Sequence, residues 1–100
     1  MQNLKGSVKK YLRGVAHNLR PVVSIGKEGL TEGVYDAIDV ALNAQELLKV
    51  QIRAERDDRK KFTAAIEERM NCVCVGAIGF MAIFYRQQTD PEKRGITLPE

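Results

Sequence analysis

The 100-residue sequence predicts a single domain of the α/β class, α+β type, with the element order αβαβαββ and a mixed four-stranded sheet. Three observations predict this fold. Apolar residues recur at helical spacing in three segments, β-branched or alternating segments lie between them, and two glycines divide the last apolar run. Strand-helix-strand connections favour parallel pairs, and the divided run favours a final antiparallel pair. A chain of this length forms one core.

The first helix is expected over residues 5–18. Its apolar residues recur at intervals of three and four: Leu4, Val8, Leu12, Val15 and Leu19. On the other side Lys5, Lys9 and Arg13 follow at intervals of four and form one exposed row. The helix must end before Pro21, because proline disfavours helical geometry at Arg20. The row is either a solvated face or a binding surface for an anion.

A β-branched run at residues 22–25 predicts the first strand, which a Gly26-x-x-Gly29 segment ends. Thr31 is the expected N-cap of the second helix. The buried stripe of that helix is Leu30, Val34, Ile38, Ala41 and Leu42. Its outer face carries Glu32, Asp36 and Asp39. Carboxylates repel phosphates, so this face is expected to contact solvent.

Apolar and polar residues alternate over residues 47–53, which predicts a half-buried strand with Lys49 and Arg53 on its polar side. Asp57 or Asp58 is the expected cap of the third helix, and Asn71 its end. The apolar positions of this helix are Phe62, Ile66 and Met70.

Gly76 and Gly79 divide the last apolar run into two predicted strands, residues 72–75 and 81–85. Phe80 and Phe84 are expected on the same face of a strand, either in the core or available to RNA or protein on an open sheet face. The domain is expected to comprise residues 1–86. Residues 87–100 then form a tail, packed by Ile96 and Leu98 at most.

Several function classes are excluded by composition. The longest uncharged apolar stretch, residues 72–85, is shorter than the ~20 residues of a membrane helix, and residues 1–20 lack the layout of a secretory signal. We therefore expect a cytoplasmic protein. Cys72 and Cys74 are expected to be buried thiols, because a disulfide between them would be strained. No group of residues has the spacing of a metal site or an active site, so we expect no metal, no cofactor, no small-molecule substrate and no enzymatic activity.

The charges are unevenly distributed along the chain. Sixteen Lys and Arg against thirteen Asp and Glu give a net charge of +3. Residues 1–30 hold six basic residues and one acid, whereas residues 31–58 hold three basic residues and seven acids. Such polarity favours a polyanionic partner, nucleic acid being the commonest. Solubility is the alternative explanation.

The Gly26-x-x-Gly29 segment has the properties of a phosphate-binding loop. A strand that runs through this segment into a helix gathers backbone N–H groups and the positive helix end at one exposed place. Both glycines allow positive φ and close approach of a ligand, and Lys27 adds a cation, whereas Glu28 opposes an anion. The segment is neither a P-loop nor a dinucleotide fingerprint. A tight turn with a purely geometric role is the alternative.

Several segments together resemble a known family. They are residues 11–17 (YLRGVAH), 21–32 (PVVSIGKEGLTE), 46–50 (ELLKV), 78–79 (IG), 84–86 (FYR) and 96–99 (ITLP). In these segments the chain is similar to the CRM domain family, named for chloroplast RNA splicing and ribosome maturation, and most of all to its single-domain bacterial, YhbY-like form. Two positions depart from the family, which often has a basic residue where Phe80 stands and a histidine where Gln45 stands.

The resemblance implies an RNA-binding domain whose fold is similar to the C-terminal domain of bacterial translation initiation factor three. It likens the glycine loop to that of KH domains. It also implies binding to rRNA in precursors of the large ribosomal subunit. We expect the protein to be a monomer. The RNA-binding residues expected from charge, loop and resemblance are Lys5, Lys9, Arg13, Arg20, Gly26, Lys27, Gly29, Lys49 and Arg86. A protein-interaction module that uses the apolar C-terminal hairpin is the alternative function.

Overall fold

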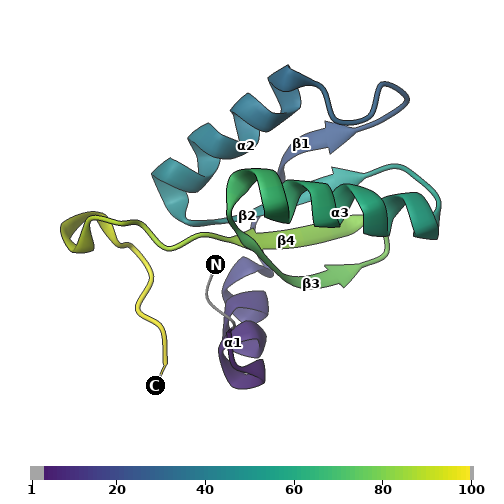
Figure 1. The fold of residues 1–100 in the computed structure, drawn as a ribbon. Helices are drawn as coiled ribbons and strands as arrows, with labels where there is room; N and C mark the ends of the chain where they lie inside the picture. Colours follow the sequence, from purple (N-terminus) through teal and green to yellow (C-terminus); the bar gives the residue numbers. More distant parts are fainter. Residues whose placement is uncertain (1–3, 100) are drawn as a thin grey trace.

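The computed structural model describes residues 4–99, so residues 1–3 of the predicted domain and residue 100 of the predicted tail lie outside it. The elements are α1 (Gly6–Ala16), β1 (Pro21–Ile25), α2 (Glu32–Gln45), β2 (Leu47–Ile52), α3 (Arg56–Met70), β3 (Val73–Ile78), β4 (Met81–Tyr85) and a one-turn helix η1 (Pro91–Lys93). Figure 1 shows this arrangement. The predicted αβαβαββ order is confirmed.

The strands form one mixed sheet in the order β1-β2-β4-β3. β1 and β2 pair in parallel, and β4 is antiparallel to both of its neighbours. The parallel first pair and the antiparallel last pair are as predicted. The expected parallel pair was wrong for β2 and β3: these strands do not pair, because β4 lies between them and pairs with both.

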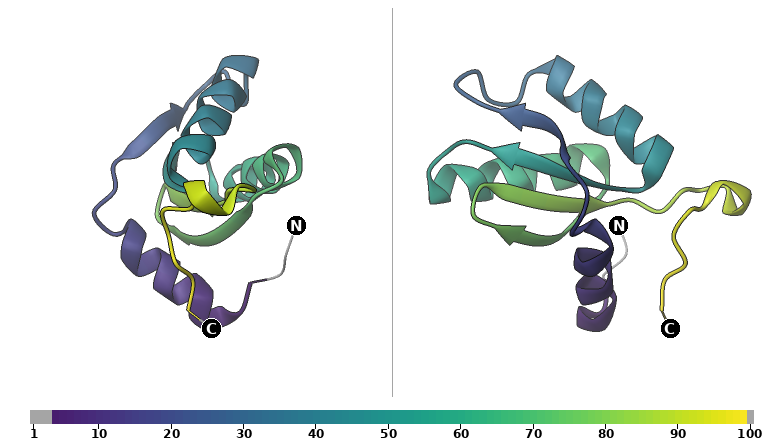
Figure 2. Two further views of the ribbon diagram at one scale, coloured as in Figure 1. Left: turned by 90° about the vertical axis from the view of Figure 1, so that its left-hand side faces the viewer. Right: turned by 180° about the vertical axis from the view of Figure 1, so that it is seen from behind.

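Helices α2 and α3 cover one face of the sheet, and α1 lies on the other (Figure 2). The first face buries Ile38 and Leu42 of α2 and Ile66 of α3 against Leu48, Val50, Ile52 and Phe84. Thr31 caps α2 as predicted, because its Oγ1 accepts a hydrogen bond from the backbone N–H of Val34. On the second face Val8, Leu12 and Ala16 of α1 pack on Leu47, Val75, Ile83 and Tyr85. The predicted apolar stripes therefore cover both faces, but the inclusion of Val15 was wrong: it is 41% exposed, and Ala16, one residue further along the helix, is buried.

The predicted cap of α3 was wrong. Glu55 is the N-cap and its side chain makes no capping bond, whereas Asp57 and Asp58 lie in the first turn. Carboxylates in the first turn stabilise the positive helix end through their charge, without a capping hydrogen bond. In the sequence alone, an aspartate in the first turn looks the same as an aspartate at the N-cap.

The predicted last strand, residues 81–85, is confirmed as β4, whereas the predicted bounds of the strand before it, residues 72–75, were wrong. β3 continues through Gly76 to Ile78, with a bulge between Cys74 and Gly76. A Cβ at position 76 would collide with Cδ of Arg13, so this glycine makes room for a side chain and does not end the strand. Phe80 lies in the two-residue turn between the strands, whereas Phe84 is fully buried. The two rings therefore do not share a strand face.

The segment after β4 is held by more than its two apolar residues. Ile96 and Leu98 pack against the α1 side of the core as predicted. In addition, the buried carboxylate of Glu46 accepts hydrogen bonds from the backbone N–H groups of Gln88 (2.7 Å), Gly95 (2.7 Å) and Ile96 (3.2 Å). The expectation that apolar packing alone holds the tail was wrong, because no local pattern shows that a glutamate beside a strand faces inward.

Both cysteines are free thiols; Cys72 is buried and Cys74 half-buried. Burial raises the pKa of Cys72 to about 12. Among residues 4–99, no three His, Cys, Asp or Glu side chains gather as metal ligands would. In the same part of the chain, no helix combines the length and apolar character needed to cross a membrane.

Candidate functional site

The basic row of α1, Lys5, Lys9 and Arg13, lies beside the sheet face on which α1 packs. Lys5 is exposed and Lys9 half-buried. Arg13 bends onto the sheet, where its Nη1 donates to the carbonyl oxygen of Val75 at 2.8 Å and its aliphatic part lies over Gly76. Arg13 thus has a structural contact as well as an exposed charge, whereas the two lysines leave their ammonium groups at the surface.

Two further candidates lie at the C-terminal end of α1. The Nζ of Lys49 donates to the carbonyl oxygen of His17 at 3.0 Å, which satisfies one of the free carbonyls at that helix end. Lys49 stands opposite Pro21 in the β1-β2 pair, and the exposed Arg20 directly precedes Pro21. The structure therefore brings Arg20 and Lys49 together beside α1.

The glycine loop is a tight turn between β1 and α2. The backbone N–H of Gly29 donates to the carbonyl oxygen of Gly26 at 3.0 Å, and Gly29 has a φ of +69°. Of the two loop glycines that allow positive φ, Gly29 adopts it and Gly26 does not. A Cβ at Gly26 would meet no described atom within 4 Å, so Gly26 leaves open space beside the exposed Lys27. Gly29 is required by the turn, and Gly26 is the position where a ligand could come close.

The α1 candidates and the glycine loop lie at opposite ends of β1. The five residues of β1 span about 17 Å, so a single phosphate group cannot contact the α1 candidates and the glycine loop at once. A strip of polar side chains on the α1 face connects them. Ser24 Oγ donates to Oε1 of Gln51 at 3.0 Å, and Nε of Arg53 donates to the same oxygen at 3.3 Å. This connection is what makes the two groups one surface.

Arg53 brings the strip to the loop, because its backbone N–H donates to the carbonyl oxygen of Ile25, the residue before Gly26. Arg53 was expected on the polar side of its strand, but Arg53, Ser24 and Gln51 were not among the predicted site residues. The signal was the alternation of Lys49, Gln51 and Arg53, which share one strand face.

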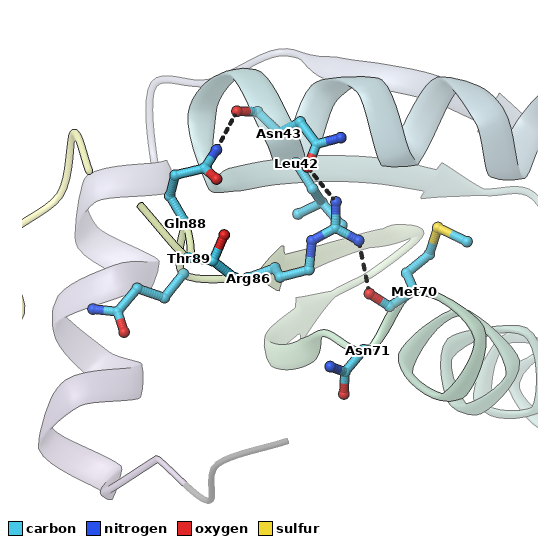
Figure 3. Close-up of a pocket in the computed structure, with 8 residues that line it drawn as sticks. Leu42, Asn43, Met70, Asn71, Arg86, Gln88 and Thr89 are labelled. Carbon is cyan, nitrogen blue, oxygen red and sulfur yellow. Dashed lines mark hydrogen bonds between the residues drawn. The ribbon is translucent and has the colours of Figure 1, made fainter. Parts of the chain in front are cut away.

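Arg86 lies apart from the other candidates. Its Nη1 donates to the carbonyl oxygen of Met70 at 2.8 Å, and its Nη2 donates to Oδ1 of Asp39 at 2.8 Å and to Oδ1 of Asn43 at 2.9 Å. Figure 3 shows its guanidinium between Asn43 of α2 and Met70 of α3. The side chain is 20% exposed. Arg86 therefore joins the C-terminal ends of α2 and α3, and the structure does not bring it to the other candidate residues.

The acidic face of α2 carries the two ion pairs found among residues 4–99. Glu32 pairs with Arg69, whose guanidinium also lies 4.1 Å from the ring centre of Tyr35, and Asp39 pairs with Arg86. These pairs link α2 to α3 and to the end of β4. The basic strip and the acidic helix face thus lie on opposite sides of the sheet.

Comparisons with known proteins agree on one family. A model of the CRS1/YhbY (CRM) domain matches residues 4–86. A Haemophilus influenzae protein named "RNA-binding protein" is 39% identical over 99% of this chain and 98% of its own length. A Bacillus subtilis protein named "Probable RNA-binding protein" is 31% identical over 96% of this chain and 99% of its own length.

The fold is also similar to a solved structure. The solution structure of a hypothetical protein from Staphylococcus aureus, described as a candidate RNA-binding protein, has a TM-score of 0.82 with this chain. The two are 36% identical, and the match covers 97% of this chain and all of the other.

Proposed function

Because the chain belongs to the CRS1/YhbY (CRM) domain family, we propose that it is an RNA-binding protein that holds phosphates along the α1 face of its sheet. The observation that carries the proposal is the continuous strip from the basic row of α1, through Ser24, Gln51 and Arg53, to the glycine loop. The names of the relatives support RNA as the ligand.

The contacts divide into two kinds. Lys5, Lys9, Arg20 and Lys49 supply cations near α1, and they recognise phosphates without regard to sequence. At the other end of β1, Gly26 lets an RNA backbone approach the loop, and Lys27 supplies a mobile charge. Arg13 contributes charge and holds α1 on the sheet. Arg86 is left out, because its guanidinium is already bonded between two helices.

The target that the family resemblance supports is rRNA in precursors of the large ribosomal subunit, bound by one copy of the protein in the cytoplasm. On sucrose gradients we expect the protein to sediment with those precursors and not with mature translating ribosomes. Recovery only in the top fractions would remove the ribosomal part of the proposal, and size-exclusion chromatography of the free protein tests the monomer.

The phosphate contacts are tested by the salt dependence of RNA binding. The double variant Lys5→Ala, Lys9→Ala should bind every RNA more weakly and reduce the slope of log K against log salt by about 0.7 to 0.9 for each lost contact. The matched control Lys61→Ala, Lys93→Ala removes the same charge from exposed positions on α3 and η1. Equal slopes for the two double variants would refute the proposed surface.

A second candidate function, protein interaction through the β3-β4 hairpin, is favoured by one observation. Ile78 and Phe80 are 73% and 53% exposed. Binding through these side chains would depend little on salt, whereas binding to phosphates weakens steeply as salt increases. The same titration therefore separates the two functions.

A further inference from the structure

An exposed aromatic side chain stands at the turn end of the sheet, outside the phosphate contacts described above. Phe80 lies in the turn between β3 and β4, where the backbone N–H of Ile52 donates to its carbonyl oxygen at 2.7 Å. Gly79 beside it has a φ of +57°, the left-handed conformation that glycine adopts without strain. The turn is thus fixed to the end of β2, and the ring projects from a rigid support.

A cation lies over this ring. The guanidinium carbon of Arg59 is 5.1 Å from the ring centre of Phe80, within the range of a cation–π contact. Nη1 of Arg59 donates to the carbonyl oxygen of Ala54 at 2.7 Å, so the guanidinium is held in place. Phe80 and Arg59 together form an aromatic and cationic pair that remains half open to solvent.

The pair forms one side of a surface hollow of about 700 Å³. Gln51 and Arg53, the end of the polar strip, line the same hollow, together with Ala54 and Glu55. The side-chain oxygen of Gln51 accepts the hydrogen bonds from Ser24 and Arg53. Among the described side chains, the amide N–H groups of Gln51 have no such partner, so they can donate to a ligand. The hollow therefore combines a stacking surface, amide donors and two arginines.

We propose that this hollow takes one unpaired nucleobase, stacked on Phe80, while the adjoining phosphates contact Arg53 and Arg56. The inference rests on the proposed RNA-binding function and adds to it a preference for single-stranded RNA. Stacking on aromatic rings and on arginine is how proteins bind unpaired bases, and every base presents a π-face. Charge complementarity favours this occupant. Arg53 and Arg59 line the hollow with Glu55, and Arg56 and Lys60 line a second hollow with Glu67, to which Arg59 also belongs.

Fluorescence of one variant tests the stacking directly. The chain contains no tryptophan, so Phe80→Trp introduces a single indole that can be excited selectively. A short single-stranded oligouridylate should quench this indole as it binds. The same strand without bases, and an RNA duplex of equal length, should bind through their phosphates and leave the indole unquenched. Equal quenching by the baseless strand would overturn the inference.

Affinity provides the second measurement. Phe80→Ala should weaken binding of the oligouridylate about fivefold to tenfold, the lower part of the range for one stacked base, because Arg59 already covers part of the ring. The salt slope should not change. Phe80→Leu should weaken binding as much, since it keeps an apolar side chain but no π-face, and Phe80→Tyr should restore it. The side chain is exposed, so circular dichroism should show all variants folded.

Ile78→Ala is the matched control, because Ile78 is an exposed apolar residue of the same hairpin. We expect it to bind the oligouridylate like the wild type. If Phe80→Leu binds like the wild type, or if Ile78→Ala loses as much affinity as Phe80→Ala, the hairpin contributes no specific stacking on the ring and the inference fails. RNA binding that remains sensitive to Lys5 and Lys9 but not to Phe80 overturns the inference and leaves the proposed function intact.

Discussion

Two pairs of charged side chains, at opposite ends of the sheet, have opposite roles. At the end where β4 finishes, Glu46 and Arg86 are occupied by the protein itself: the carboxylate accepts three backbone N–H groups and the guanidinium joins two helices. At the turn end, Lys27 and Arg56 are exposed, and neither ion pair found among residues 4–99 involves them. A charge that the fold already satisfies contributes to stability, and a charge at the surface is available to a ligand.

We expect the largest effect from a variant that removes the hydrogen bonds of Glu46. Glu46→Ala removes the acceptor of three backbone hydrogen bonds, and we expect it to lower the free energy of unfolding by about 3 kcal/mol. Glu46→Gln is the matched control, because its amide oxygen can still accept from Gly95 and Ile96, and it should lose less. Urea denaturation measures both. Equal stability of Glu46→Ala and the wild type would mean that the tail is held by apolar packing alone.

A pair of arginine variants compares the two ends directly. Arg86→Ala should lower the free energy of unfolding by about 2 kcal/mol, because it leaves the half-exposed Asp39 and the carbonyl of Met70 without their partner. Arg53→Ala should change it by less than about 0.5 kcal/mol. In RNA binding the order should reverse, with about a fivefold loss for Arg53→Ala and none for folded Arg86→Ala. The same order in both measurements would contradict the comparison.

At the turn end, substitutions of the two loop glycines, Gly26 and Gly29, should also have different effects on stability and on RNA binding. Gly29→Ala should cost about 1 kcal/mol of stability, because its φ of +69° strains any residue with a Cβ. Gly26→Ala should cost less than about 0.5 kcal/mol, since its Cβ would meet no described atom within 4 Å. If RNA approaches this position, Gly26→Ala should nevertheless weaken binding about fivefold. Thermal denaturation and filter binding on the same samples test both statements.

The effect that is smallest at neutral pH comes from two buried groups, Tyr85 and Cys72, whose titration changes stability only at alkaline pH. Burial, with a contribution from the nearby charge of Glu46, raises the pKa of Tyr85 from 10.0 to about 12, and burial raises that of Cys72 from 9.0 to about 12. The folded state therefore favours the neutral forms. Their contribution is complete below about pH 9 and is lost as the pH rises toward 12.

Tyr85→Phe isolates one of these groups. Among residues 4–99 the buried hydroxyl of Tyr85 has no hydrogen-bond partner, so its removal should leave stability at neutral pH unchanged or slightly higher. At alkaline pH the variant should lose less stability than the wild type. Urea denaturation at neutral pH and near pH 11 measures both effects, and equal alkaline loss in the two proteins would contradict the burial of this group.

The contrast between the two ends also explains which features could be predicted from the sequence. The α2 cap at Thr31 and the apolar stripe of α1 depend on neighbours along the chain, and both were predicted. The partners of Arg86 lie 16 and 47 residues away, and Glu46 binds residues 42 to 50 positions later. No local pattern reports such contacts, so Arg86 was included among the RNA-binding residues and Glu46 was overlooked.

The candidate surface follows the same rule. The row of Lys5, Lys9 and Arg13 and the loop from Gly26 to Gly29 are local patterns. Their connection through Ser24 and Gln51 depends on the pairing of β1 with β2, which alternation alone does not specify. The position of Phe80 depends on whether Gly76 ends the strand or makes room for another side chain. Gly76 makes room for Arg13, a contact between distant parts of the sequence that the local pattern does not show.

The inward carboxylate of Glu46 also determines the order in which the domain can be completed during synthesis. Gly95 follows it by 49 residues, and until Gly95 and Ile96 have been made the carboxylate lacks two of its donors. Ile96 and Leu98 also complete the core beneath α1, which precedes the strands along the chain. Glu46 and α1 can therefore complete their contacts only after residues 95–98 have been synthesised. Such distant contacts slow folding, and α1 remains incompletely packed for most of the time in which the rest of the sheet is being translated.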